Sequence, residues 1–504
     1  MLLRTRTSAW LTVVLIFLTF SVVVYIRTTP STTLPQIDIP IAPKPIVAAA
    51  NFTLDSCPKS LDWLKDLSID FPIKYARRDI IVHPKPGLER ASLTKIDEPI
   101  FSEGQMIDMS DNANVKLEHC KEPLMLDVPD FPREPVDASH MMFGVATLLD
   151  RLDTSIPYFL RWLPYTKARL FIIVEGPDDT EPDTVGMAAM QAKMRGLGMD
   201  VKLVKPLDRK DNMPERYFSL VKLMYSHRNE KTKWITIIDD DTFFPAMHAL
   251  VDVLDKHDHS QEWYIGGMSE EWWSVVRYGM MGFGGAGVFL SIPMAAVLDK
   301  NYEDCKRRSG AGAGDLRIVE CINWHSSTRL THIAGLHQID IHGDRSGLLE
   351  SGRRLLSFHH WKEGWWDEGG YGTWFPLHAM HYVADVCGDC FLQRWQFGND
   401  MVLSNGYSIA TYPTGALKKA DMRQAEGTWQ DAGLVEDSNN AGWDHYVGPL
   451  RPMLQLEKEK IQYRFLDAIV VDGGVKQFYL HLGLNDDLDT LLEIFWITKR
   501  TSIG

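Results

Sequence analysis

Three consecutive aspartates, Asp239, Asp240 and Asp241, directly follow an apolar run at residues 234–238 (WITII). Such a run is typical of a buried strand, so the carboxylates are expected at its C-terminal end, where open α/β sheets bind their ligands. Adjacent carboxylates repel one another unless a cation neutralises them. The pattern therefore predicts a divalent metal with oxygen ligands, which would usually also hold a diphosphate. The alternative is a solvated acidic turn.

A glycine-rich stretch follows at residues 282–291 (GFGGAGVFLS). Gly284, Gly285 and Gly287 allow backbone conformations and close approaches that side chains would forbid. We expect this loop to lie against a sugar or a nucleotide, and a tight turn between two strands is the alternative.

A second glycine-rich loop lies between Cys305 and Cys321 and presents Asp315 at the start of a predicted helix. A disulfide between the two cysteines would clamp this loop. A lone aspartate at a helix start is usually an N-cap. A clamped carboxylate that faces a sugar could equally act as the general base for an attacking hydroxyl group.

Histidines gather further along the chain. Residues 335–344 (GLHQIDIHGD) are dense in His and Asp, and His359 and His360 end another apolar run. Single histidines are more often hydrogen-bonded core residues than ligands. A pair at a strand end, in a chain that already has three consecutive aspartates, is a better candidate for completing a metal site.

The elements that must position these residues alternate between strands and helices. Continuous apolar strands followed by amphipathic stretches predict βαβ units and a largely parallel sheet. Beyond about residue 380 the pattern changes to short strands and turns. We therefore predict an α/β domain with a nucleotide-binding layout at residues 136–380, an N-terminal wrapping segment at 51–135, and a smaller strand-rich C-terminal extension at 381–504.

The N-terminus predicts a membrane anchor. Arg4 and Arg6 precede an uncharged apolar stretch at residues 9–26, which as a helix would span roughly 27 Å. A cleaved signal peptide is the alternative, but the stretch is long for one. Residues 1–8 would be a cytoplasmic tail and residues 27–50, rich in Pro and Thr, a stem. This arrangement predicts a single-pass type II protein with a lumenal body.

Cysteine content agrees with an oxidising compartment. An even number of cysteines permits disulfide pairing, and Asn51 begins a glycosylation sequon. Cys387 and Cys390 form a CxxC motif, which could instead be redox-active or half of a zinc site. Sequence proximity favours three pairs: Cys57 with Cys120, Cys305 with Cys321, and Cys387 with Cys390.

The net charge of −14 argues against nucleic acid as a partner, because a phosphate backbone is held by clustered Lys and Arg.

The motifs together resemble those of the Fringe-like β-1,3-glycosyltransferases, of the glycosyltransferase family 31 type. The stretch at residues 335–344 looks like the related subfamily known as domain of unknown function 604. The similarity covers roughly residues 140–420. The motifs that carry it, in order, are 239–242 (DDDT), 264–267 (YIGG), 284–287 (GGAG), the Cys305 and Cys321 pair around Asp315, and 358–361 (FHHW).

The resemblance implies that the α/β domain has a GT-A-like nucleotide-sugar-binding fold, and that the protein is a metal-dependent transferase that moves a sugar from a UDP-sugar to a glycan or glycoprotein. Asp241 would bind Mn²⁺ or another divalent cation, with Asp239 and Asp240 supporting the metal or the nucleotide ribose. His360 would be the second protein ligand and His359 its substitute. The location implied is the Golgi or endoplasmic reticulum membrane.

The resemblance also implies that Asp315 is the catalytic base and that the loop from Gly284 to Gly287 lies against the donor or acceptor sugar. A single displacement with this base would invert the anomeric configuration. The chain departs from the family by placing Ala313 and Gly314 before Asp315, where an acidic pair is frequent.

Two other functions are compatible with the sequence. One is a catalytically silent protein that binds glycans or nucleotides on the same fold. The other is a metal-dependent phosphoester hydrolase, which would act without any acceptor.

Overall fold

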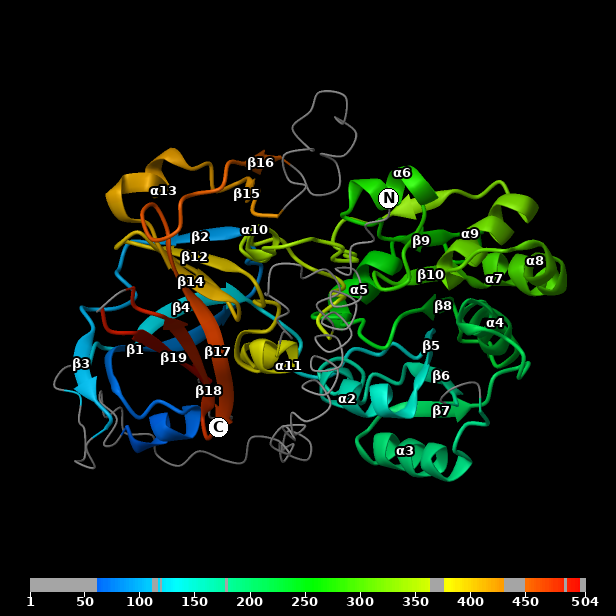
Figure 1. The fold of residues 1–504 in the computed structure, drawn as a ribbon, viewed down its shortest axis with the longest axis horizontal. Coiled ribbons are helices and arrows are strands. Elements are labelled where there is room, and N and C mark those ends of the chain that lie inside the picture. The colour runs from blue at the N-terminus through cyan, green and yellow to red at the C-terminus, as the bar shows by residue number, and fades with distance from the viewer. Residues whose placement is uncertain are drawn as a thin grey trace, which may run out of the picture. The chain divides into compact units, whose positions relative to one another are not determined.

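The computed structural model describes residues 61–110, 117, 120–176, 180–362, 376–429, 449–484 and 487–498 of the 504-residue chain (Figure 1). No helix within these ranges is long and apolar enough to cross a membrane. The predicted tail, anchor and stem at residues 1–50, and the sequon at Asn51, lie outside them.

A seven-stranded sheet carries the aspartates, with the strand order β11-β9-β10-β8-β5-β6-β7. β5, β6, β7 and β8 run parallel, whereas β10 is antiparallel to β8 and β9. The predicted α/β organisation is confirmed, and β10 makes the sheet mixed. The strands are β5 (Met141–Leu148), β6 (Arg169–Glu175), β7 (Asp200–Val204), β8 (Trp234–Ile237), β9 (Tyr264–Gly266), β10 (Val288–Ser291) and β11 (Leu330–His332).

Both faces of this sheet are buried, which explains why its strands are continuous apolar runs. Alternate residues of β5 point to opposite faces: Phe143 joins one hydrophobic cluster and Met142 the other. The first cluster includes residues of α2 (Leu149–Phe159), α3 (Thr184–Gly196) and α5 (Met247–Leu254). The second includes residues of α4 (Met213–Ser226), α7 (Ile292–Lys300), α8 (Tyr302–Arg308) and α9 (Gly314–His325).

A second, ten-stranded sheet joins the two ends of the described chain (Figure 1). Its order is β2-β12-β13-β14-β17-β18-β19-β1-β3, and β4 pairs with β1. β1 (Pro72–Lys85) runs parallel to β19 (Thr490–Thr498). The remaining strands are β2 (Leu93–Ile96), β3 (Gln105–Asp108), β4 (Leu124–Pro129), β12 (Arg394–Phe397), β13 (Met401–Ser404), β14 (Ser408–Thr411), β17 (Ile461–Val471) and β18 (Gly474–His481).

The strands at residues 72–129 therefore share one sheet with those at residues 394–498, although the sequence suggested two separate segments. Further short elements are η1 (Asp62–Leu67), α6 (Trp272–Tyr278), α10 (Ser346–Leu349), α11 (Leu377–Met380), η3 (His381–Val383), α12 (Ala384–Cys387), η4 (Pro413–Gly415), α13 (Ala416–Lys419), β15 (Ala425–Glu426) and β16 (Leu450–Arg451).

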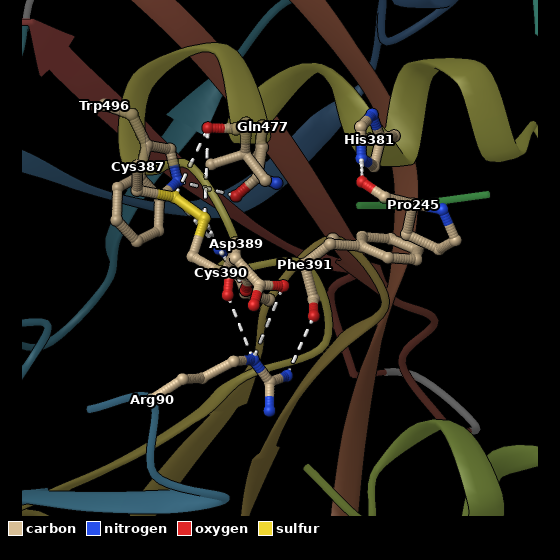
Figure 2. The surroundings of a disulfide bond; sticks show 12 residues. Arg90, Pro245, His381, Cys387, Asp389, Cys390, Phe391, Gln477 and Trp496 are labelled. Carbon is tan, nitrogen blue, oxygen red and sulfur yellow. Dashed lines mark hydrogen bonds and ion pairs between the residues drawn. A yellow bond between two sulfur atoms is a disulfide. The ribbon is translucent and has the colours of Figure 1, made fainter. Parts of the chain in front are cut away.

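His381 connects η3 to the loop that follows the aspartates. Its Nε2 donates to the carbonyl oxygen of Pro245 over 2.7 Å (Figure 2). Its Nδ1 accepts from Arg161, whose guanidinium also pairs with Asp385 at 2.7 Å. Burial, together with the Arg161 charge, lowers the pKa of His381 to about 3. The ring is therefore neutral, which lets its two nitrogens serve one donor and one acceptor.

Two of the predicted disulfides are confirmed, Cys305–Cys321 and Cys387–Cys390. Cys387 and Cys390 are fully buried. Arg90 holds their turn by donating to the carbonyl oxygens of Asp389 and Phe391 (Figure 2). This burial favours a structural role over a redox-active one. Because Cys57 lies outside the described residues, its pairing with Cys120 stays a prediction.

The disulfide that closes the longer loop of the chain should contribute more to stability. The pairs are 16 and 3 residues apart in the sequence, and loop-closure entropy assigns them about 3 and about 2 kcal/mol. Replacing Cys305 and Cys321 by alanine should therefore lower the Tm more than the same change at Cys387 and Cys390. Thermal unfolding of the two double variants measures this, and the reverse order would show that local packing outweighs chain entropy.

Candidate active site

The three aspartates lie at the point where the order of the parallel strands reverses. The chain runs from β5 outward through β6 to β7, and then returns to β8 on the other side of β5. Asp239 and Asp240 follow the C-terminal end of β8 directly beside the C-terminal half of β5. Open α/β sheets bind ligands in the crevice at such a point.

Asp240 is committed to protein cations. Its carboxylate accepts from Arg151 through both oxygens at 2.9 Å and from the Thr147 hydroxyl group. The Lys362 ammonium lies 3.6 Å away. These contacts hold the first turn of α2 to the end of β8, and they leave Asp240 little capacity to bind a metal.

Asp241 and Asp239 face a different partner, His359. The Nε2 of His359 lies 3.0 Å from Asp241 Oδ1 and 3.3 Å from Asp239 Oδ2. Burial opposes charge on His359, but the two carboxylates raise its pKa well above the usual value. Burial likewise opposes ionisation of Asp241, and the His359 charge outweighs it and lowers the Asp241 pKa. A His359 imidazolium ion therefore offsets one of the two negative charges of this carboxylate pair when no metal is bound.

The histidine pair reaches the aspartates through backbone pairing. Phe243 and Phe358 form an antiparallel bridge with two N–H···O bonds of 2.8 Å. Adjacent side chains on a strand normally point to opposite faces. His360 instead has φ = 53°, and its ring centre lies 3.9 Å from that of His359. This left-handed residue brings both rings to one side of the chain.

Asp241, His359 and His360 form a group whose potential ligand atoms all lie within 4.8 Å of one another. An octahedral ion with bonds of about 2.1 Å separates adjacent ligand atoms by about 3 Å, which matches the 3.0 Å between Asp241 and His359. Carboxylate suits Mg²⁺ and Mn²⁺, and imidazole suits later transition metals. The residues therefore fit a divalent cation. His359, which the resemblance implied only as a substitute for His360, contacts Asp241 directly, and Asp239 lies beside the group.

Asp315 lies in the first turn of α9, whose N-cap is Ala313. Its Oδ2 accepts the N–H of Gly284 at 3.0 Å and its Oδ1 the N–H of Leu316 at 2.7 Å. Burial of the carboxyl group raises its pKa to about 6, and the Asp239 charge adds to the shift. The residue keeps intermediate exposure. Asp315 is thus a carboxylate with a base strength suited to proton transfer near neutral pH.

Tyr217 fills the space between the carboxylates and was not singled out by the sequence. Burial, followed by the charges of Asp239 and Asp315, raises its pKa well above the usual value, so the phenol stays neutral. A Cβ on Gly314 would lie 2.3 Å from the Tyr217 ring. The residue before Asp315 therefore has no room for a side chain, which explains the absence of an acidic pair. No local signal in the sequence indicates Tyr217, because it lies within an ordinary amphipathic helix, α4.

The glycines of residues 284–287 make room for site side chains. A Cβ on Gly284 would lie 2.0 Å from the Tyr217 hydroxyl oxygen, and a Cβ on Gly285 would lie 2.1 Å from Nδ1 of His359. Gly287 has φ = +92°, a conformation that L side chains rarely adopt. The structure thus places two of the three glycines against site side chains.

Replacing Gly285 by alanine should displace His359. The overlap requires a shift of either the ring or the loop, so we expect a loss of stability of about 1–3 kcal/mol and at least about tenfold weaker Mn²⁺ binding. Gly312→Ala is the matched control, because a Cβ there meets nothing within 4 Å. Calorimetric Mn²⁺ titration and thermal unfolding measure both effects. Equal behaviour of the two variants would contradict the packing argument.

Residues 274–364 match the family described as "Protein of unknown function, DUF604", which confirms that resemblance over this range. The match includes the glycine loop, Asp315 and the histidine pair, but it begins after the three aspartates. No curated protein matches the chain.

Several solved structures that resemble the chain are glycosyltransferases. GlyE of Streptococcus pneumoniae TIGR4 has 11% identity and a TM-score of 0.27, with 38% of this chain and 45% of that chain covered. An active-site mutant of LgtC has 13% identity and a TM-score of 0.27, with coverage of 39% and 73%. Mouse xyloside xylosyltransferase 1 has 12% identity and a TM-score of 0.27, with coverage of 39% and 85%. At this level of similarity they assign neither activity nor substrate to the chain.

Proposed function

We propose that this protein is a metal-dependent glycosyltransferase that transfers a sugar from a UDP-sugar to a glycan or glycoprotein acceptor. One observation carries the proposal: a candidate metal group and a weakly acidic carboxyl group lie on either side of two consecutive glycines. Gly284 donates its N–H to Asp315, and Gly285 packs against His359. A metal ion that stabilises the leaving group and a base that deprotonates the attacking hydroxyl group would therefore lie on either side of one short loop.

On the donor side, Asp241, His359 and His360 would hold Mn²⁺ or a similar cation. When bound, such an ion neutralises the charge that develops on a departing diphosphate. His359 would exchange its proton for the ion, and Asp239, with a side chain 34% exposed, remains open toward the ligand. Arg151, also partly exposed, adds a positive charge beside the site.

On the acceptor side, Asp315 would take the proton from the attacking hydroxyl group. Its two backbone contacts hold the carboxylate in place while its partial exposure leaves access for the acceptor. The bond from the acceptor oxygen to the anomeric carbon forms as the bond to the diphosphate breaks, and the proton passes to Asp315. A single displacement inverts the configuration, so an α-linked donor gives a β-linked product. The Fringe-like resemblance suggests a β-1,3 linkage.

We also propose that the protein acts in the lumen of the Golgi or endoplasmic reticulum as a type II membrane protein. The buried Cys387–Cys390 and clamped Cys305–Cys321 disulfides support an oxidising compartment. The apolar stretch at residues 9–26 supports an anchor. Protease protection of the chain in sealed microsomes, with loss of protection after detergent, tests the orientation.

The direct test of activity is release of UDP from a panel of UDP-sugars, with and without Mn²⁺ and a mixture of glycan acceptors. Mn²⁺-dependent release from one donor, with the sugar appearing on an acceptor, would establish the activity. UDP and Mn²⁺ binding without release in any combination would favour the silent binding protein. Turnover of a simple phosphoester without acceptor would favour the hydrolase.

A further inference from the structure

Each histidine of the candidate metal group has one ring nitrogen committed to a partner outside the group. Nδ1 of His359 lies 3.1 Å from the carbonyl oxygen of Gln338, which can only accept. Nε2 of His360 lies 2.9 Å from Oδ1 of Asp340. Both partners come from the segment at residues 338–340.

These contacts determine which nitrogen of each ring carries a lone pair. In a neutral imidazole one nitrogen donates and the other accepts. His359 must donate from Nδ1 to the carbonyl oxygen, so its Nε2, which faces Asp241 and Asp239, is free to bind a metal. By the same reasoning, a donor at Nε2 of His360 leaves its Nδ1 as the ligand atom.

We propose that Asp340 is a positioning residue for the metal site, which holds His360 as the Nε2–H tautomer so that Nδ1 faces the ion beside Nε2 of His359. This inference rests on the proposed metal-dependent function and assigns a role to the His- and Asp-rich stretch at residues 335–344. Hydrogen-bond partners of metal-binding histidines commonly set ring orientation and basicity.

The neighbours of Asp340 leave one of its carboxylate oxygens available to accept a hydrogen bond from His360. The hydroxyl group of Ser269 donates to its Oδ2 at 2.5 Å. That hydroxyl proton is directed to Asp340 because Ser269 Oγ itself accepts the N–H of Glu271 at 3.0 Å. The Asp340 N–H in turn donates to Glu270 at 3.2 Å. One carboxylate oxygen is thus satisfied by Ser269, and the other is left for His360.

This arrangement predicts a specific consequence of Asp340→Asn. The Ser269 hydroxyl would continue to donate, so the asparagine oxygen would turn toward Ser269 and its amide would face Nε2 of His360. An amide N–H requires an acceptor there, which moves the imidazole proton to Nδ1. The nitrogen assigned to the metal would then carry a proton.

The test measures binding of Mn²⁺ alone to the full chain, by the electron paramagnetic resonance signal of free Mn²⁺. We expect Asp340→Asn to weaken binding by about 10- to 100-fold. Adding Ser269→Ala should restore part of the affinity, because the asparagine can then turn its oxygen to His360. ¹⁵N NMR of labelled histidines should show the His360 proton on Nε2 in the wild type and on Nδ1 in Asp340→Asn.

Glu271→Gln is the matched control. Glu271 pairs with His342 over 3.1 Å in the same region, but His342 is not part of the metal group, so Mn²⁺ affinity should not change. Equal Mn²⁺ affinity of the wild type and Asp340→Asn would overturn the positioning role and leave the proposed function intact. Absence of Mn²⁺ binding by the wild type would instead overturn the metal site itself. Weakening by Asp340→Asn without rescue or a tautomer change would reduce Asp340 to a packing role.

Discussion

Replacing Asp315 with asparagine should lower kcat by about 10²- to 10⁴-fold, the range typical for loss of a general base. Asparagine preserves the size of the side chain and can still accept the N–H of Gly284, but it cannot take a proton. Because Asp315 is not part of the metal group, affinities for Mn²⁺ and UDP should stay within about twofold of the wild type.

Single-turnover transfer separates this effect from binding. Glu320→Gln is a suitable control on the same helix, since Glu320 accepts from Ser309 at 2.5 Å and none of the described contacts joins it to a site residue. If Asp315→Asn retained more than about a tenth of the wild-type kcat, another group would have to be the base.

The pH profile provides an independent test of the same carboxylate. Burial and the Asp239 charge raise the pKa of Asp315 to about 6. Only the ionised form can accept a proton, so kcat/KM should be constant above this pKa and fall tenfold per unit below it. We expect the acid limb of wild-type kcat/KM near pH 6, and its absence in the residual activity of Asp315→Asn. If kcat/KM instead fell near pH 4, the Asp315 carboxyl group would be exposed to water and would have an ordinary pKa.

The strand that carries the aspartates could be predicted from sequence because its signal is local. An apolar run ending in polar residues indicates a buried strand and its functional edge, and the structure places residues 234–237 in β8. The Cys305–Cys321 pair followed from proximity in the same way. By contrast, β1 and β19 pair across more than 400 residues of sequence, and neither strand carries any signal that names its partner.

The different roles of the three aspartates could not be predicted, because they depend on residues from other elements. Asp240 is occupied by Arg151 of α2, and Asp241 by His359, which arrives through the bridge at Phe358. The approach of both histidines depends on one left-handed residue, His360, which composition does not indicate. Sequence alone identifies the carboxylates, and tertiary structure decides which of them lie beside the histidine pair.

Asp241 and Asp240 are therefore expected to differ sharply when each is changed to asparagine. Asp241→Asn removes the carboxylate of the metal group, so we expect at least about a hundredfold weaker Mn²⁺ binding and a matching loss of transfer that excess Mn²⁺ only partly restores. Asp240→Asn removes the partner of Arg151 and leaves the buried Lys362 without its counter-charge. It should chiefly reduce stability, by about 1–3 kcal/mol for the buried donors left without their acceptor, and lower the Tm.

Mn²⁺ titration, thermal unfolding without Mn²⁺, and UDP release at saturating Mn²⁺, each measured on both variants, form a complete test. We expect Asp241→Asn to lose metal affinity with a smaller fall in Tm than Asp240→Asn, because His359 still has Asp239 beside it and can also release its proton when the Asp241 charge is removed. We also expect Asp240→Asn to retain metal affinity while unfolding earlier. If Asp240→Asn lost Mn²⁺ and Asp241→Asn did not, the cation would bind on the Arg151 side of β8, and His359 would serve only as the counter-charge of Asp241.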